Sequence, residues 1–199
     1  AAIGPYGTAP WKHCGIDKTF WEYWHQVATP TFVDNPWANG GGSIDLATFV
    51  ATHGTPDVVI FNLQNDPSNA APGDVPAVFA EAMTYAEDII GWWKAVAPAA
   101  LFGITTIYPG ATDPATGWGS AAQRDIYHEK WHHWAELTQA YWAGRESDRI
   151  RTISTYIGTD GRRHYCAVPG NGDAHHLARN GHVGLADCLE AWLAHYAYQ

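Results

Sequence analysis

The stretch PDVVIFNLQND, residues 56–66, decides the fold class. It opens with a turn and continues as an unbroken run of β-branched and aromatic residues, which is typical of a strand buried in a parallel sheet. Polar residues follow directly, with Asn65 and Asp66 where the strand is expected to end. Because ligands gather at the carboxyl ends of parallel strands, the stretch predicts a site beside Asn65.

Helices and strands alternate on both sides of this stretch. Upstream, SIDLATFVATHG predicts a short helix with Ser43 as its N-cap. Downstream, the pattern predicts an amphipathic helix over residues 74–98, a buried strand over 100–110, a helix over 120–146, a strand over 148–160 and a last helix over about 180–196. Such alternation predicts a three-layer α/β/α sandwich with a parallel sheet. We expect one domain over residues 1–199, with the irregular, Trp-, Gly- and Pro-rich residues 1–42 packed on it.

Composition narrows the function classes. The net charge is −9 and no Lys/Arg cluster occurs, so the phosphate-neutralising patch of a nucleic-acid-binding protein is missing. No apolar run is long enough for a membrane span. The 11 Trp residues exceed ordinary usage and serve either as core or as cleft walls for flat, hydroxylated ligands. Trp21, Trp37 and Trp118 are the candidates for such a cleft.

The chain begins at Ala1 with no signal pattern, so we expect a processed form or a fragment. Three cysteines, Cys14, Cys166 and Cys188, allow one disulfide and one free thiol, an arrangement typical of an exported protein. We expect an extracellular or virion-associated location rather than a cytoplasmic one.

The stretch GNGDAHHLARNGHVGLADCLEAW, residues 170–192, carries the acid–base chemistry. Asp173 lies three residues before His176 on an expected loop, and a carboxylate that holds one ring nitrogen makes a histidine a general base. Asn65, just past a buried strand, is suited to donate a hydrogen bond to an oxyanion. Ordinary alternatives are a helix cap for Asp173 and turn chemistry for Asn65.

Taken together, these two motifs resemble the SGNH (GDSL-type) hydrolase family, and the resemblance implies a flavodoxin-like sandwich. It also implies that Asn65 is the oxyanion asparagine, Asp173 the triad acid and His176 the triad base.

Further segments share the resemblance. His182 after Gly181 completes the local pattern, whereas His175 occupies a variable position. Residues 35–61 look like the equivalent region of larger phage and bacterial members, and the resemblance runs from about Gly7 to the C-terminus.

The chain departs from the family at the nucleophile. The family's Gly-Asp-Ser block and the first strand that carries it are not found in this sequence, and only Gly15 is available for the glycine that completes the oxyanion hole. Three explanations stay open. The nucleophile belongs to a preceding, separate segment, or the protein is a catalytically inactive binding domain, or a serine such as Ser43 or Ser68 substitutes.

A competing pattern lies in the helix over residues 120–146. His128-Glu129-x-x-His132 matches a zinc-peptidase motif, in which two histidines one turn apart bind the metal and the glutamate is the general base. Glu146 or Glu190 would be the third ligand. Lys130 lies between the two histidines and its charge would oppose Zn²⁺.

The resemblance implies a serine esterase that needs no cofactor and acts on short acyl esters, such as acetyl groups on a small molecule or a glycan. A binding domain without activity and a zinc metallopeptidase are the alternatives.

Overall fold

The computed structural model describes residues 46–62, 71–107, 120–158, 165–168, 171–177 and 179–196 of the 199. For β4 and β5, introduced below, it describes the backbone alone. The segment predicted to pack over residues 1–42 and the predicted cap at Ser43 lie outside these ranges. The chain divides into two compact units, of which the first comprises Ala1–Pro56 and Thr84–Pro98, and the second comprises Asp57–Met83 and Ala99–Gln199.

The described part of the first unit is helical. Helix α2 (Leu46–His53) ends at Gly54, whose φ of +88° is accessible to glycine at little cost. The Gly54 N–H donates to the carbonyl of Val50, which closes the helix. Helix α3 (Val75–Val96) runs from the second unit into the first and ends before Pro98, as the sequence predicted.

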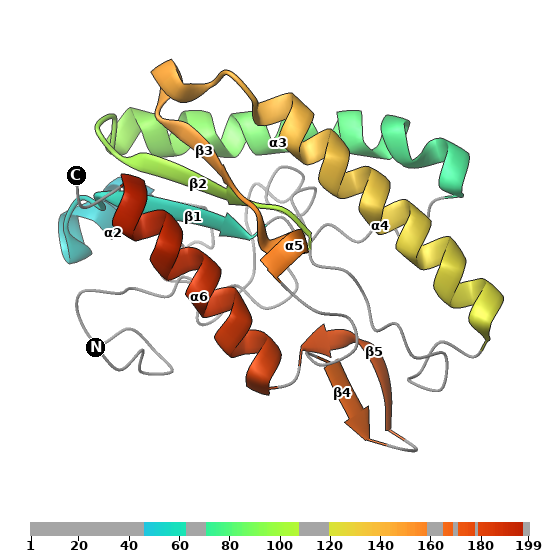
Figure 1. Cartoon of the computed structure of the whole chain (residues 1–199). Helices are drawn as coiled ribbons and strands as arrows, with labels where there is room; N and C mark the ends of the chain where they lie inside the picture. The colour runs from blue at the N-terminus through green and yellow to red at the C-terminus, as the bar shows by residue number, and fades with distance from the viewer. Residues whose placement is uncertain are drawn as a thin grey trace. The chain divides into compact units, whose positions relative to one another are not determined.

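The second unit contains a parallel sheet of three strands, β1 (Val58–Asn62), β2 (Leu101–Thr105) and β3 (Ile150–Ile153). Their spatial order is β1-β2-β3, so β2 and β3 each pair with the strand that precedes them in the chain (Figure 1). Phe102 is the register partner of Val59 on one side and of Ile150 on the other. Every residue of β2 is buried, whereas residues 58–61 of β1 are half-buried. The predicted α/β class with a parallel sheet is confirmed.

Helix α4 (Ala121–Trp142) connects β2 to β3 and contacts β3. It starts as predicted at Ser120, whose hydroxyl accepts a hydrogen bond from the backbone N–H of Gln123.

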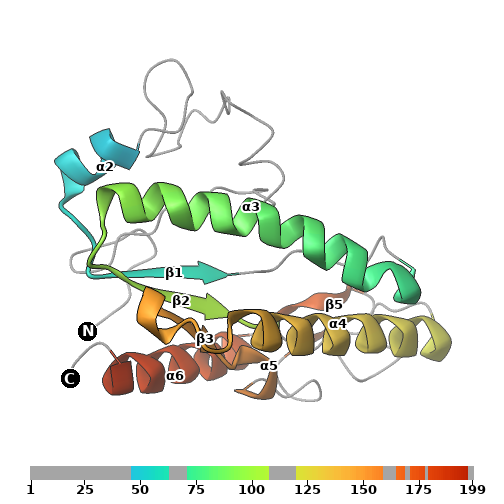
Figure 2. The same ribbon diagram turned by 90° about the horizontal axis from the view of Figure 1, so that it is seen from above.

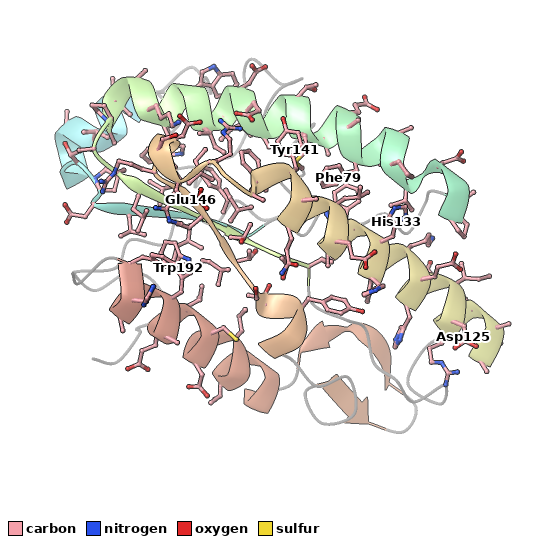
Figure 3. The ribbon with its side chains drawn as sticks, turned by 45° about the horizontal axis from the view of Figure 1, so that its top comes forward. Phe79, Asp125, His133, Tyr141, Glu146 and Trp192 are labelled. Carbon is pink, nitrogen blue, oxygen red and sulfur yellow. The ribbon has the colours of Figure 1, made fainter. Side chains whose placement is uncertain are left out.

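The inner face of α4 carries large aromatic side chains. Trp134 packs edge to face on Phe79, with ring centroids 5.1 Å apart, and Tyr141 meets the same Phe79 ring at 6.0 Å (Figure 3). Trp131 and Trp142 are buried as well. The tryptophans of this helix are therefore core residues.

Helix α6 (Arg179–Tyr196) covers one face of the sheet. A Cβ placed on Gly103 would lie 3.1 Å from Cη2 of Trp192, so the indole rests on the bare backbone of β2. The side chain of Trp192 points from α6 toward the strands in Figure 3. The helix runs back along the sheet against the direction of the strands (Figures 1 and 2).

Two local predictions were wrong. The strand predicted over residues 148–160 ends at Ile153, and a single helical turn, α5 (Thr155–Gly158), follows. Residues 170–177, expected as a loop, are largely strand: β4 (Tyr165–Val168) pairs antiparallel with β5 (Asn171–Leu177). Pro169 and Gly170 alone separate these strands in the sequence, and Pro-Gly is favoured turn chemistry. Residues 171–177 form a strand because they pair with β4, although their polar, Gly-rich sequence does not indicate one.

Candidate functional site

The carboxyl ends of β1, β2 and β3 form the edge at which a parallel sheet binds ligands. The chain leaves β1 at Asn62 into residues 63–70, leaves β2 at Thr105, and leaves β3 at Ile153 into α5. In both ribbon views β5 lies beyond these ends, and α6, which follows β5, contacts both β5 and β3 (Figures 1 and 2). This edge is the candidate site.

Asp173 and His176 belong to β5. The register of the hairpin is irregular at this point. Tyr165 pairs with Leu177, and Ala167 pairs with Gly172. Residues 172–177 of β5 therefore lie opposite only residues 165–167 of β4. Such bulges are over-represented at sheet edges and beside active sites, and they bend the strand that carries them. Asp173 and His176 therefore both lie in the stretch of β5 where the regular pairing with β4 is interrupted. Their side chains lie outside the described part of the chain.

The other predicted site residues lie outside the described residues. They are Gly15, Ser43, Asn65 and Ser68, together with Cys14, Trp21, Trp37 and Trp118. The side chains of Cys166, His175 and His182 are outside as well, although their backbones belong to β4, β5 and α6. The assignment of Asn65 as an oxyanion donor and of Gly15 as its partner stays a prediction.

A pair of buried threonine hydroxyls lies where β2 and β3 end. We call residues 105–106 and 154–156 together the junction. Thr106 and Thr155 are 1% and 0% exposed, and their Oγ1 atoms are 3.2 Å apart. The Thr155 hydroxyl also donates to the carbonyl of Thr106. The backbone N–H of Tyr156 donates to Oγ1 of Thr106 at 2.9 Å, and the Thr106 N–H donates to the carbonyl of Ile153 at 2.9 Å. Side-chain hydroxyls thus continue the hydrogen bonding of the sheet into the first turn of α5.

A polar cluster joins α4 to the junction. The ring of His132 lies 5.5 Å from that of Tyr156, and its Nε2 is 3.2 Å from Oε1 of Glu136. Farther along α4, the side-chain amide of Gln139 donates to the hydroxyl of Ser154. Burial raises the pKa of Tyr156, and the negative charge of Glu136 raises it further. The phenol therefore stays protonated at neutral pH and can donate a hydrogen bond.

Sequence reasoning missed this cluster because it assigned Ser154, Thr155 and Tyr156 to a strand. The signal was present: three hydroxyl residues directly after an apolar strand run suit the end of a strand better than its middle. The partners on α4 could not be found this way, because only tertiary packing brings Tyr156 to His132.

The five residues proposed for a zinc-peptidase site, which form no three-ligand group, are His128, Glu129, His132, Glu146 and Glu190. All five are described, and within the described part of the chain no three His, Cys, Asp or Glu side chains form a group that could hold a metal ion. His132 lies beside Glu136 instead. The C-terminal end of α4, at Trp142, is about 15 Å along the helix axis from His132. Glu146 follows that end, so it is too far from His132 to share a metal ion, and Figure 3 shows it at the end of α4 opposite to Asp125.

The sequence predicted that the charge of Lys130, which lies between the two histidines in the chain, would oppose a bound metal ion. In the structure the Lys130 side chain is directed away from the surface that His132 occupies. The residue is 3% exposed, and its Nζ lies 4.5 Å from the centre of the Tyr127 ring. The side chain of His132, by contrast, is 57% exposed. Lys130 therefore points into the protein while His132 points toward solvent. A cation–π contact accounts for part of the stabilisation of this buried charge.

Of the three cysteines, Cys188 on α6 is a free thiol. Burial raises its pKa, the neighbouring charge of Asp187 raises it further, and a backbone hydrogen bond offsets part of the effect. The thiolate is the reactive form, so this cysteine is a poor nucleophile at neutral pH.

Comparisons of the chain with protein-family models, with curated proteins and with solved structures find no match. Among the described residues, no helix is long and apolar enough to cross a membrane.

Proposed function

We propose that the chain is a serine ester hydrolase of the SGNH type that acts on short acyl esters, with acetylated small molecules or glycans as the substrate class. The observation that carries the proposal is the position of β5. The strand that contains Asp173 and His176 lies beyond the carboxyl ends of β1, β2 and β3, at the edge where the chain leaves β1 toward Asn65.

The order of the strands supports the same proposal. A flavodoxin-like sheet, the core of a three-layer α/β/α sandwich, has the strand order 2-1-3-4-5, so its last three strands are adjacent and follow the chain. The order β1-β2-β3 matches those three strands. In that arrangement the strand that carries the nucleophile would pair along β1.

The proposed reaction is acyl transfer in two steps. A serine hydroxyl attacks the acyl carbon while His176 takes the hydroxyl proton and Asp173 orients the imidazole. Asn65 donates a hydrogen bond to the oxyanion. The intermediate expels the alcohol, which takes the proton from His176, and water then releases the acid by the same route. No cofactor takes part.

Hydrolysis of 4-nitrophenyl acetate by the full-length gene product tests the proposal. His176→Ala and Asp173→Asn should each lower kcat/KM by about 100-fold or more, since general-base catalysis contributes roughly 10² to 10⁴. Asn65→Ala should cost about 100-fold for the lost oxyanion donor. His175→Ala, one position away, is the matched control and should retain activity.

A fluorophosphonate probe followed by peptide mapping identifies the nucleophile, including Ser43 or Ser68 if one of them substitutes. Turnover that is equal in His176→Ala and His175→Ala contradicts the esterase proposal. A wild-type protein with no turnover supports the inactive binding domain instead.

A further inference from the structure

Buried hydrogen bonds are concentrated at the junction after β2 and β3. Thr106 and Thr155 bury both hydroxyls, and they bond to each other and to the backbone on both sides of the junction. A buried polar group is costly unless it is satisfied, and a satisfied network fixes one geometry. This network fixes how α5 leaves the sheet.

The fixed element is connected to the candidate site. Helix α5 contacts α6, and α6 contacts β5, the strand that contains Asp173 and His176. Only Ala178 separates the last residue of β5 from the first residue of α6. A shift of α5 would therefore reach β5 through α6.

A second set of contacts holds the junction from the side of α4. His132 packs on Tyr156, and Gln139 donates to Ser154, so two places along α4 contact the residues on either side of Thr155. Helix α4 itself contacts β3. The junction is thus tied to the sheet and to a long helix, which is the support that a precise site needs from the residues around it.

We propose that Thr106 and Thr155 are positioning residues for the acid–base pair: their buried hydroxyl network sets α5 against α6 and so sets the strand that carries Asp173 and His176. The inference rests on the proposed esterase function for its catalytic consequence. Its structural consequence, the ordering of β5, can be measured without any activity.

The test compares Thr106→Val and Thr155→Val with Thr138→Val. Thr138 is also fully buried, and its hydroxyl donates to the carbonyl of Trp134 within the same helix, so its hydrogen bond is local to α4 and is not one of those between Thr106 and Thr155. We expect both junction variants to lower kcat on 4-nitrophenyl acetate by about tenfold or more with KM nearly unchanged, because a misplacement of about 1 Å can cost roughly 100-fold. Hydrogen exchange over residues 165–177 should be faster in both. Thr155→Ser, which keeps the hydroxyl, should match the wild type in both readouts.

Thr138→Val should change neither readout. If the junction variants match Thr138→Val in kcat and in exchange over residues 165–177, the inference is wrong. If the valine variants do not fold, His132→Ala, which removes an exposed ring from Tyr156, should produce a smaller change in the same direction. A wild-type protein without esterase activity refutes the proposed function alone, and the exchange measurement then decides the positioning role.

Discussion

Gly103 of β2 and Trp192 of α6 are in direct contact, with the indole lying on the backbone that a side chain would otherwise cover. A Cβ at position 103 would be 2.7 Å from Cδ1 of Ile153 and 3.1 Å from Cη2 of Trp192. The first distance is too short for a real contact, so Ile153 would have to shift, and the second requires the indole ring to move.

Gly103→Ala should therefore destabilise the protein by about 1–3 kcal/mol, the usual cost of overpacking a core. Trp192→Phe removes the part of the ring that meets the new methyl group, so the double variant should lose less stability than the sum of the two single variants. Urea denaturation of the four proteins measures the coupling. Additive losses would show that the indole does not limit the space above Gly103.

Ser120→Ala should cost about 1 kcal/mol, because the hydroxyl of Ser120 caps α4 by accepting from the N–H of Gln123. Ser120→Asp should preserve the cap and most of the stability. Ser147→Ala, at an exposed position in the short helix η3 (Glu146–Asp148), is the matched control. The midpoint of thermal unfolding reports all three. An equal midpoint for Ser120→Ala and Ser147→Ala would contradict the capping role.

Tyr156 should make stability depend on alkaline pH. Its pKa is raised in the folded protein by burial and by the charge of Glu136, so the folded state holds the phenolic proton more tightly than the unfolded state does. The resulting stabilisation is fully present below the ordinary tyrosine pKa of about 10, and it is lost as the pH rises through the higher folded value. The free energy of unfolding should fall more steeply above pH ~10 for the wild type than for Tyr156→Phe. Parallel curves for the two proteins would contradict the raised pKa.

Cys188 should react slowly with iodoacetamide at neutral pH, since burial and Asp187 both raise its pKa. Asp187→Asn removes the second cause, so alkylation of Cys188 should become faster while the helix is preserved. Mass spectrometry of the peptide that contains Cys188 follows this thiol separately from Cys14 and Cys166. Glu190→Gln, two residues away on the same helix, is the control. No gain for Asp187→Asn over this control would mean that the charge of Asp187 does not act on the thiol.

The sequence predicted the elements whose signals are local. Helices α3 and α4 followed from their apolar periodicity, from Pro98 and from the cap at Ser120, and β2 followed from an apolar run between helices. Strand β5 could not be predicted this way. Gly, Asn and Asp disfavour strands, and only the pairing with β4 makes this segment one.

The residues of the candidate site also fall into two groups, those that a local sequence signal indicates and those that only packing brings together. Asp173 and His176 were singled out by a motif in the sequence, and the backbone of β5 now gives them a location. The contact of His132 with Tyr156 and the burial of Lys130 depend on how α4 packs, and no spacing along the chain indicates either. Lysine in particular is typical of the surface and is seldom fully buried.

The sequential order β1-β2-β3 also bears on how the polypeptide assembles as it leaves the ribosome. β2 and β3 each emerge when the strand they pair with is already present, so of the three only β1 waits for a later strand. Because domains generally begin folding from the N-terminal side during synthesis, strand edges are covered in the order in which they emerge. Such vectorial growth shortens the time for which an unpaired edge is open to another chain.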